Sequence, residues 1–301
     1  MKKLVALALS LLMLFGLCAV ASAEGELVYL ITMDRMDQHW VAVDQGAKDM
    51  AAALGLNYKW DAPEAKDNAT QIEALHNAVS DGASLILLAA NDQVAISMAI
   101  KEAKDAGVKV IYVDSGANEP AIATLSTDNY NAGKLAGQTM LADLEAAGIT
   151  EGKIAVIGVN TATNSTMQRE NGFRDAIAAD GKFTVLETEY KNGDAAGSQD
   201  SATNFINANP DLVGIFGTNE GSTVGTGNAI KAAGLADTII GVGFDKSDAI
   251  LGLLADGSLK AAMAQNPYTM GFLGMAQAYA ALNGLSTGPA VIDTGVAVLT
   301  K

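Results

Sequence analysis

The sequence predicts an α/β fold of two lobes, each built around a doubly wound parallel sheet and joined by a hinge of several strands. Two observations support this prediction. Short apolar runs alternate with helical patterns along residues 27–264, and the first three helices each end at a glycine, at Gly55, Gly82 and Gly107. The alternation also occurs twice, without a strict sequence repeat. Alternating strands and helices favour parallel sheets with right-handed crossovers, so the duplication predicts two similar lobes that face each other.

The first series contains strands that are mostly apolar, as strands buried on both faces of a parallel sheet require. The strand at residues 27–31 opens it, and a polar loop separates that strand from the first helix. We expect strands at residues 27–31, 58–60, 85–88 and 108–113, with helices at 39–54, 68–80 and 94–106 between them.

The second series follows the same pattern. Its fourth strand, at residues 239–242, passes through Gly243 to Phe244 and Asp245 before the next helix begins. We expect strands at residues 154–159, 184–188, 213–216, 239–242 and 260–264, with helices at 166–179, 195–207, 222–233 and 247–255.

The connections between the two series predict a hinge. Residues 123–129 lack proline and glycine, so we interpret them as a strand that crosses between the lobes and leads into a helix at 131–147. A helix that follows Pro267 and ends near Leu282 returns to the first lobe. We therefore assign residues 24–127 and 266–292 to the N-terminal lobe, and 128–265 and 293–301 to the C-terminal lobe. A few residues at such crossings can absorb the rotation of rigid lobes.

The first 23 residues have the pattern of a secretory signal peptide. Lys2 and Lys3 precede an apolar run at residues 4–20, and small residues end at Ala23, after which we expect cleavage. A lipid anchor on Cys18 is not expected, because Leu17 occupies a position where a lipoprotein signal needs a small residue. No later apolar run is long enough to span a bilayer. The sequence thus predicts a protein of the periplasm, without disulfides.

The charge excludes several partners. The chain has 19 Lys and Arg against 34 Asp and Glu, and its formal net charge of -15 becomes -17 when the two lysines of the signal peptide are removed. The acidic residues are scattered along the chain. This balance argues against binding to nucleic acid or to an anionic membrane surface.

The residues Phe244 and Asp245 suggest a ligand site. In open α/β sheets, ligands bind beyond the carboxyl ends of the strands, where the loops diverge. A sugar fits an aromatic ring beside a carboxylate, because its C–H face lies on the ring while its hydroxyls donate to the carboxylate. The alternative is that Phe244 belongs to the core and that Asp245 only caps the following helix.

Several short motifs resemble one family over essentially the whole mature chain: the periplasmic sugar-binding proteins of ABC importers, of the ribose-binding type, also called type I periplasmic binding proteins. Their fold is shared with lactose-repressor-like regulators. The motifs are Asp128-Asn129 with Gly133-Lys134-Leu135-Ala136-Gly137, Arg169 before Gly172-Phe173, Asn219-Glu220, Gly243-Phe244-Asp245, and Ala264-Gln265.

The resemblance implies Rossmann-like lobes and a binding function without enzymatic activity. A monomer would bind a monosaccharide or similar polyhydroxylated molecule between its lobes, and hinge closure would deliver it to the membrane permease of an ABC importer. No cofactor or metal is implied. Two alternatives remain: a chemotaxis or quorum-signal sensor that feeds a membrane receptor, and an exported hydrolase or lyase that uses Asp114 and Asp245 as acid and base.

The resemblance also implies roles for individual residues. Arg169 would donate a fork of hydrogen bonds to ligand oxygens, Asp114 and Asp245 would accept from hydroxyls, and Trp40 would stack opposite Phe244. The implied ligand-binding residues are Asp37, His39, Trp40, Asp114, Ser115, Arg169, Asn219, Phe244, Asp245 and Gln265.

The chain departs from the ribose-binding pattern at two positions. Ser115 stands where ribose-type proteins carry Arg, and Ala89 where they carry Asn. Because a site that reads hydroxyls strongly rejects a ligand that leaves its polar groups unpaired, these departures argue against ribose itself. A hexose, another pentose, a polyol or a quorum signal remain as candidates.

Other chemistries lack a complete set of residues. The acidic and His residues of the loop after the first strand, Asp34, Asp37 and His39, have no fourth ligand at metal-binding spacing. No Ser lies in a Gly-x-Ser-x-Gly turn, and no dinucleotide-binding fingerprint is complete.

Overall fold

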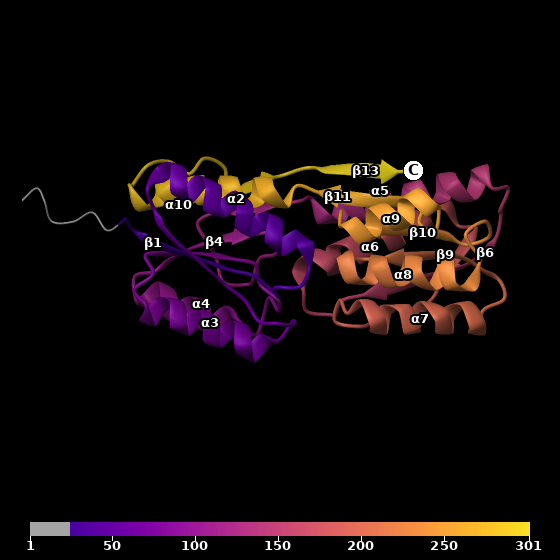
Figure 1. The fold of residues 1–301 in the computed structure, drawn as a ribbon, viewed down its shortest axis with the longest axis horizontal. Helices are drawn as coiled ribbons and strands as arrows, with labels where there is room; N and C mark the ends of the chain where they lie inside the picture. The colour runs from indigo at the N-terminus through magenta and orange to yellow at the C-terminus, as the bar shows by residue number, and fades with distance from the viewer. Residues whose placement is uncertain (1–24) are drawn as a thin grey trace, which may run out of the picture.

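The computed structural model describes residues 25–301, and these residues form two lobes that lie side by side along the long axis of the molecule (Figure 1). The predicted signal peptide, with Cys18 and the expected cleavage after Ala23, lies outside the described residues. Each lobe is a predominantly parallel sheet covered by helices on both faces, and this confirms the predicted fold class.

The N-terminal lobe contains a six-stranded sheet with the order β12-β5-β4-β3-β1-β2, in which every neighbouring pair is parallel. Helices α2 and α10 cover one face, and α3 and α4 cover the other. The strands are β1 (Leu27–Ile31), β2 (Asn57–Asp61), β3 (Leu85–Leu88), β4 (Lys109–Val113), β5 (Thr124–Ser126) and β12 (Val291–Asp293), and the helices are α2 (Gln38–Leu54), α3 (Asn68–Ser80), α4 (Ser97–Asp105) and α10 (Pro267–Leu282).

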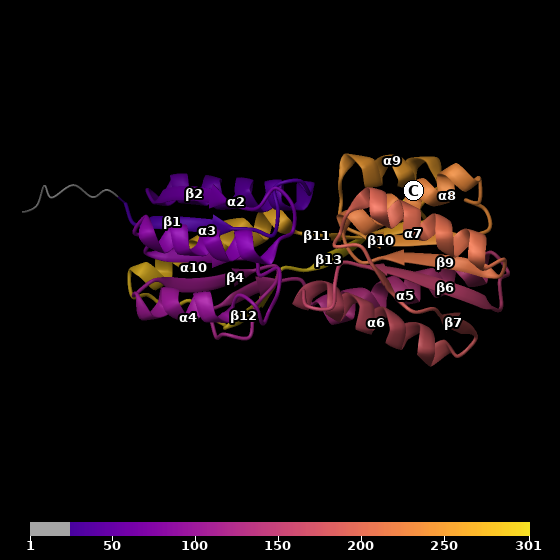
Figure 2. The same ribbon diagram turned by 90° about the horizontal axis from the view of Figure 1, so that it is seen from below.

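The C-terminal lobe contains a sheet with the order β13-β11-β10-β9-β6-β7, and β8 also pairs with β6. Only β13, which is antiparallel to β11, breaks the parallel arrangement among the described strands. Helices α5 and α6 pack on one face of the sheet, and α7 and α8 pack on the other (Figure 2). The strands are β6 (Gly152–Gly158), β7 (Phe183–Val185), β8 (Glu189–Tyr190), β9 (Leu212–Gly217), β10 (Ile240–Phe244), β11 (Ala261–Gln265) and β13 (Val296–Thr300), and the helices are α5 (Asn129–Ala146), α6 (Asn164–Asp180), α7 (Ala195–Ala208), α8 (Glu220–Ala233) and α9 (Asp248–Asp256).

The chain passes between the two sheets three times, from β5 to α5, from β11 to α10 and from β12 to β13. The crossings are bonded to one another, because Thr127 Oγ1 donates to Gln265 Oε1 at 2.9 Å and Asn266 Nδ2 donates to the carbonyl of Thr294 at 2.7 Å. Parallel crossings of this kind allow the lobes to rotate relative to each other while each sheet stays intact.

Two elements differ from the sequence prediction for local reasons. The helix expected at 94–106 begins at Ser97, because Asp92 Oδ1 accepts from the N–H groups of Val94 and Ala95 and holds them in a turn. The strand expected at 184–188 ends at Val185 as β7, and a separate strand β8 follows at Glu189; the two pair with different parts of β6. Among residues 25–301, no helix is long and apolar enough to cross a membrane.

Candidate functional site

A narrow cavity lies between the lobes, at the carboxyl ends of strands from both sheets. Most of the residues that line it are polar or charged, and both lobes contribute to it. The residues that line the cavity are Met33, Asp37, His39, Trp40, Lys66 and Asp114 from the N-terminal lobe, and Val159, Thr163, Ser165, Thr166, Arg169, Asn219, Asp245 and Gln265 from the C-terminal lobe.

Two aspartates occupy matching places in the two lobes. Asp114 directly follows β4 and Asp245 directly follows β10, and both have left-handed backbone conformations, with φ of 62° and 77°. A residue other than glycine rarely adopts this conformation, and such strain is concentrated at functional sites. In each case the backbone N–H is held by the neighbouring strand, at Leu125 and Met263 respectively. The strained turns aim both carboxylates into the cavity.

The imidazole of His39 lies between these two carboxylates. Its Nε2 is 3.3 Å from Asp114 Oδ1, and its Nδ1 is 3.6 Å from Asp245 Oδ1 across the cleft. Burial lowers the pKa of His39, but the two aspartates outweigh burial, and the pKa is raised above its ordinary value. For Asp114, burial raises the pKa, but His39 and Arg169 outweigh it and the pKa is lowered. The geometry therefore favours an imidazolium ion that bridges the lobes.

The guanidinium of Arg169 is fixed on three sides. Its Nε donates to Asn129 Oδ1 at 2.8 Å, its Nη1 donates to the carbonyl of Thr218 at 3.0 Å, and its Cζ lies 4.3 Å from the centre of the Phe244 ring. Nη2 is buried, has no hydrogen-bond partner, and lies 3.8 Å from Asp114 Oδ1. The fork expected from the sequence is thus used mainly to hold Arg169 itself, and Nη2 is the nitrogen left for a ligand.

The N-terminus of α8 supplies two more polar side chains. Asn219 caps the helix, because its Oδ1 accepts from the N–H of Ser222 at 3.1 Å, while its Nδ2 is buried without a partner. Glu220 reaches across the cleft and accepts from the N–H of His39 at 3.2 Å. Burial, together with the charges of Asp37 and Asp245, raises the pKa of Glu220 to about 7.

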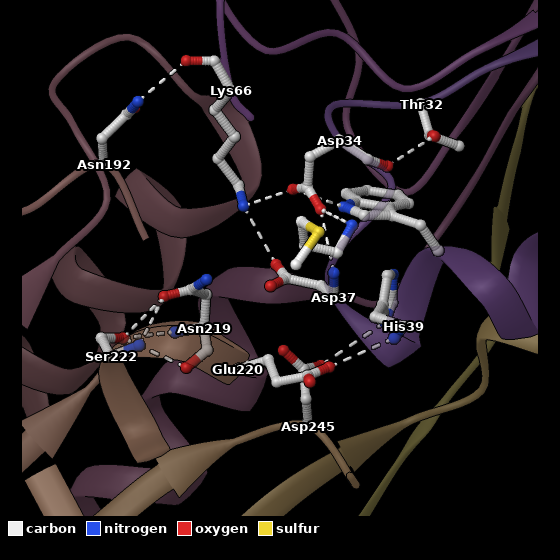
Figure 3. A network of polar contacts seen from close by, with 12 residues as sticks. Thr32, Asp34, Asp37, His39, Lys66, Asn192, Asn219, Glu220, Ser222 and Asp245 are labelled. Atoms are coloured by element: carbon white, nitrogen blue, oxygen red, sulfur yellow. Dashed lines mark hydrogen bonds and ion pairs between the residues drawn. The ribbon is translucent and has the colours of Figure 1, made fainter. Parts of the chain in front are cut away.

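A buried lysine organises the opposite wall, as Figure 3 shows. The ammonium of Lys66 donates to Asp34 and, at 3.0 Å, to Asp37. Asp34 also accepts from Trp40 Nε1 at 3.2 Å, so the lysine and the indole share one carboxylate. Burial lowers the pKa of Lys66, but the two carboxylates outweigh burial and the pKa is raised, so the ammonium stays charged. Asp34 and Asp37, two of the three residues considered above as metal ligands, are thus paired with Lys66. No cluster able to hold a metal ion occurs in residues 25–301.

The structure brings together eight of the ten residues implied by the resemblance, and it places two outside the wall. Ser115 is buried behind the wall, where its Oγ accepts weakly from the N–H of Ser165 at 3.5 Å. Phe244 is fully buried and packs at 6.1 Å from Phe216, so it does not face Trp40 across the cavity. Phe244 is the last residue of β10 and belongs to the core, whereas the left-handed turn at Asp245, just after the strand, directs that carboxylate into the cavity.

The alternative interpretation of Phe244 and Asp245 is therefore correct for Phe244, which is a core residue, but wrong for Asp245, which is not the helix cap. The cap of α9 is Ser247, whose Oγ accepts from the N–H of Ile250. Lys66 and Glu220 were not among the predicted site residues. Glu220 did belong to a motif of the resemblance, whereas Lys66 lies in a loop without any motif.

Direct contacts between the lobes close the cavity. They lie on both sides of the cleft and involve backbone and side-chain groups. The hydrogen bonds include Thr163 Oγ1 to Asn91 O (2.6 Å), Asn164 Nδ2 to Gln93 Oε1 (2.9 Å), the N–H of Gln93 to Ala162 O (3.2 Å), Asn192 Nδ2 to Lys66 O (2.9 Å), the N–H of Asp248 to Gln38 Oε1 (3.1 Å) and the N–H of His39 to Glu220 (3.2 Å).

The fold and the site define a class of protein: a two-lobed binding protein that encloses a small polar ligand between its lobes. Comparison with known proteins gives the family. Residues 28–286 match the periplasmic binding protein domain, and this chain belongs to that family. The sequence is 28% identical over 286 residues to the ribose import binding protein of Salmonella typhimurium, and the match covers 94% of each chain.

Two solved structures show the same fold. One is a carbohydrate transporter solute binding protein of Agrobacterium radiobacter in complex with D-arabinose, with a TM-score of 0.90 and 31% identity over 93% of this chain and 96% of that one. The other is an ABC transporter solute binding protein of Agrobacterium vitis with bound D-fucose, with a TM-score of 0.84 and 33% identity over 91% of this chain and 95% of that one. The comparisons confirm the resemblance to type I periplasmic sugar-binding proteins of ABC transporters.

Proposed function

We propose that this protein binds a monosaccharide, or a similar neutral polyhydroxylated molecule, in the cavity between its lobes and delivers it by hinge closure to the membrane permease of an ABC importer. It would act in the periplasm, as a monomer and without catalysis. The relatives that bind ribose, D-arabinose and D-fucose support a ligand of this size and chemistry.

One observation carries the proposal: buried polar atoms from both lobes converge on the cavity without a hydrogen bond, although three of them lie within ion-pair distance of one another. They are His39 Nε2 and Asp114 Oδ1 from one lobe, and Arg169 Nη2 and Asn219 Nδ2 from the other. A buried polar group without a hydrogen bond costs about 1–3 kcal/mol, so a ligand that satisfies all four is strongly favoured. The set includes both donors and acceptors, and hydroxyl groups can serve both.

The closed cleft supports the proposed mechanism. A ligand held by Asp114 on one side and by Asp245 on the other touches both carboxylates only when the lobes are together. Because such a ligand binds the closed form better than the open form, it shifts the equilibrium between them towards closure. A permease that recognises the closed shape would then receive loaded protein.

A thermal-shift screen of mature protein against monosaccharides and polyols tests the proposal. A ligand present at 100 times its Kd stabilises the folded state by about 2.7 kcal/mol, which raises the Tm by about 5 °C or more for a chain of this size. We expect at least one neutral sugar to produce this shift and to be recovered unchanged. The absence of a shift with every neutral sugar would contradict the proposed ligand class, and chemical turnover would contradict the absence of catalysis.

A further inference from the structure

Lys66 has a hydrogen-bond donor that the protein does not use. Its ammonium carries three N–H groups. Two of them are directed to Asp34 and Asp37, and the side chain is only 7% exposed, so water has little access to the third. Because Lys66 also lines the cavity, the remaining N–H is available to a ligand there.

Asn219 presents a second unused donor from the opposite lobe. Its Oδ1 is occupied by the backbone N–H and the hydroxyl of Ser222, and this capping interaction fixes the orientation of the amide. The Nδ2 that remains is buried and has no partner, and Asn219 as a whole is 6% exposed. The capping role of Asn219 therefore determines that a donor, not an acceptor, points towards the cavity.

The two nitrogens lie close together at the seam between the lobes. A Cβ atom on Gly193 would be 3.2 Å from Lys66 Nζ and 2.8 Å from Asn219 Nδ2, so both nitrogens pack beside this glycine of the C-terminal lobe, while both side chains also line the cavity. In Figure 3 the ammonium and the amide nitrogen both face the space beside Asp37. The bond from Asn192 Nδ2 to the carbonyl of Lys66, at 2.9 Å, fixes the lysine loop against the C-terminal lobe in this position.

Two converging donors require an oxygen that accepts. The sugar hydroxyls have carboxylate partners elsewhere in the cavity, at Asp114 and Asp245, whereas a ring oxygen can only accept. A ligand carboxylate would also accept, but the charge of Lys66 is already balanced by two aspartates, and more carboxylates face the cavity. The surroundings therefore favour a neutral acceptor.

We propose that Lys66 and Asn219 together bind the ring oxygen of the sugar, and that Lys66 thereby determines specificity for cyclic sugars over carbocycles and open-chain polyols. This proposal rests on the proposed function, because it concerns the same cavity.

The test compares a sugar with its carbocyclic analogue, in which a CH2 group replaces the ring oxygen. D-ribose, D-arabinose and D-fucose are titrated calorimetrically into wild-type protein, and the tightest of them is paired with its analogue. We expect the analogue to bind at least about tenfold more weakly to wild-type protein, because two buried donors lose their acceptor. Lys66→Met and Asn219→Asp should each reduce this preference to less than about threefold, because each removes one donor.

Two features of the design distinguish a loss of recognition from a loss of folding. Asn219→Asp keeps an oxygen that caps α8 through Ser222, so it removes the donor while it retains the helix cap. Lys101→Met, on an exposed lysine that pairs with Asp105 far from the cavity, serves as the matched control and should keep the wild-type preference. A merely structural role for Lys66 would weaken both ligands equally and leave their ratio unchanged.

The outcomes separate the two proposals. If a sugar binds and both Lys66→Met and Asn219→Asp keep the wild-type ratio, the ring-oxygen assignment is wrong while the proposed function stands. If wild-type protein binds the sugar and its analogue equally well, the assignment is likewise overturned. If none of the three sugars and no other neutral sugar binds, the proposed function fails and the assignment fails with it.

Discussion

Ligand affinity should fall as the pH rises from 5.5 to 8.0, because closure of the cleft buries Glu220. In the closed structure Glu220 lies close to Asp37 and Asp245 and accepts from the N–H of His39 across the cleft, and its pKa is raised from 4.5 to about 7. Opening separates Glu220 from the N-terminal lobe, so its pKa returns towards the ordinary value. The closed form therefore holds a proton that the open form releases, and closure is favoured below pH 4.5 and weakened as the pH rises through 7.

The size of this effect follows from the shift. A change from 4.5 to about 7 corresponds to a ceiling of about 3.4 kcal/mol, at about 1.4 kcal/mol for each pKa unit. Asp245 belongs to the same lobe as Glu220 and keeps part of the shift in the open form. We therefore expect about 1–2 kcal/mol, which is binding about 5–30-fold weaker at pH 8.0 than at pH 5.5.

Calorimetric titration in buffers of different ionisation enthalpy measures both the affinity and the number of protons taken up on binding. Glu220→Gln keeps an acceptor for the N–H of His39 but cannot titrate, so its pH profile should be flatter than that of wild type. Glu145→Gln, on an exposed part of α5, is the matched control and should leave the profile unchanged. Equal wild-type affinity at pH 5.5 and 8.0, or an unchanged slope in Glu220→Gln, would refute the reasoning.

Two further predictions concern single side chains. Ligand binding should change the fluorescence of Trp40, which lines the cavity, and not that of Trp60, whose Nε1 donates to Thr32 outside it. Trp60→Phe should therefore keep the fluorescence change, and Trp40→Phe should abolish it. The reverse pattern would show that the ligand binds elsewhere. Arg169→Lys keeps the positive charge but loses the hydrogen bonds to Asn129 and Thr218 and the free Nη2. We therefore expect sugar binding to weaken by about 1–3 kcal/mol in calorimetric titrations. Wild-type affinity in this variant would place Arg169 outside the site.

Most of the fold could be predicted because its signals are local and periodic. Buried parallel strands are apolar runs, and helices end where glycine adopts a left-handed conformation, as Gly55 does with a φ of 66°. The site residues at strand ends, such as Asp114 and Asp245, could also be found, because a parallel sheet brings its carboxyl ends to one edge.

The remaining site residues depend on information that is not local. Lys66 lies in a loop without periodicity, and its role arises from Asp34 and Asp37, which come from a distant loop. Phe244 could not be placed from sequence, because an aromatic residue at a strand end faces either the core or the cleft according to backbone angles at a single position. The left-handed turn at Asp245 decides this, and no residue pattern announces such a turn when the residue is not glycine.

The two strained aspartates explain why the site is divided between the lobes. A left-handed conformation costs about 1–2 kcal/mol for a residue other than glycine. This conformation occurs at both Asp114 and Asp245, at equivalent strand ends, and both carboxylates lie beside the imidazole of His39. His39 therefore satisfies these carboxylates in part when the cleft is closed, and a sugar that offers hydroxyls at better geometry competes with that contact. The affinity of the protein then depends on how much better a ligand serves Asp114 and Asp245 than their present partners, which are His39 and, for Asp245, also Gln265 Nε2 at 2.6 Å.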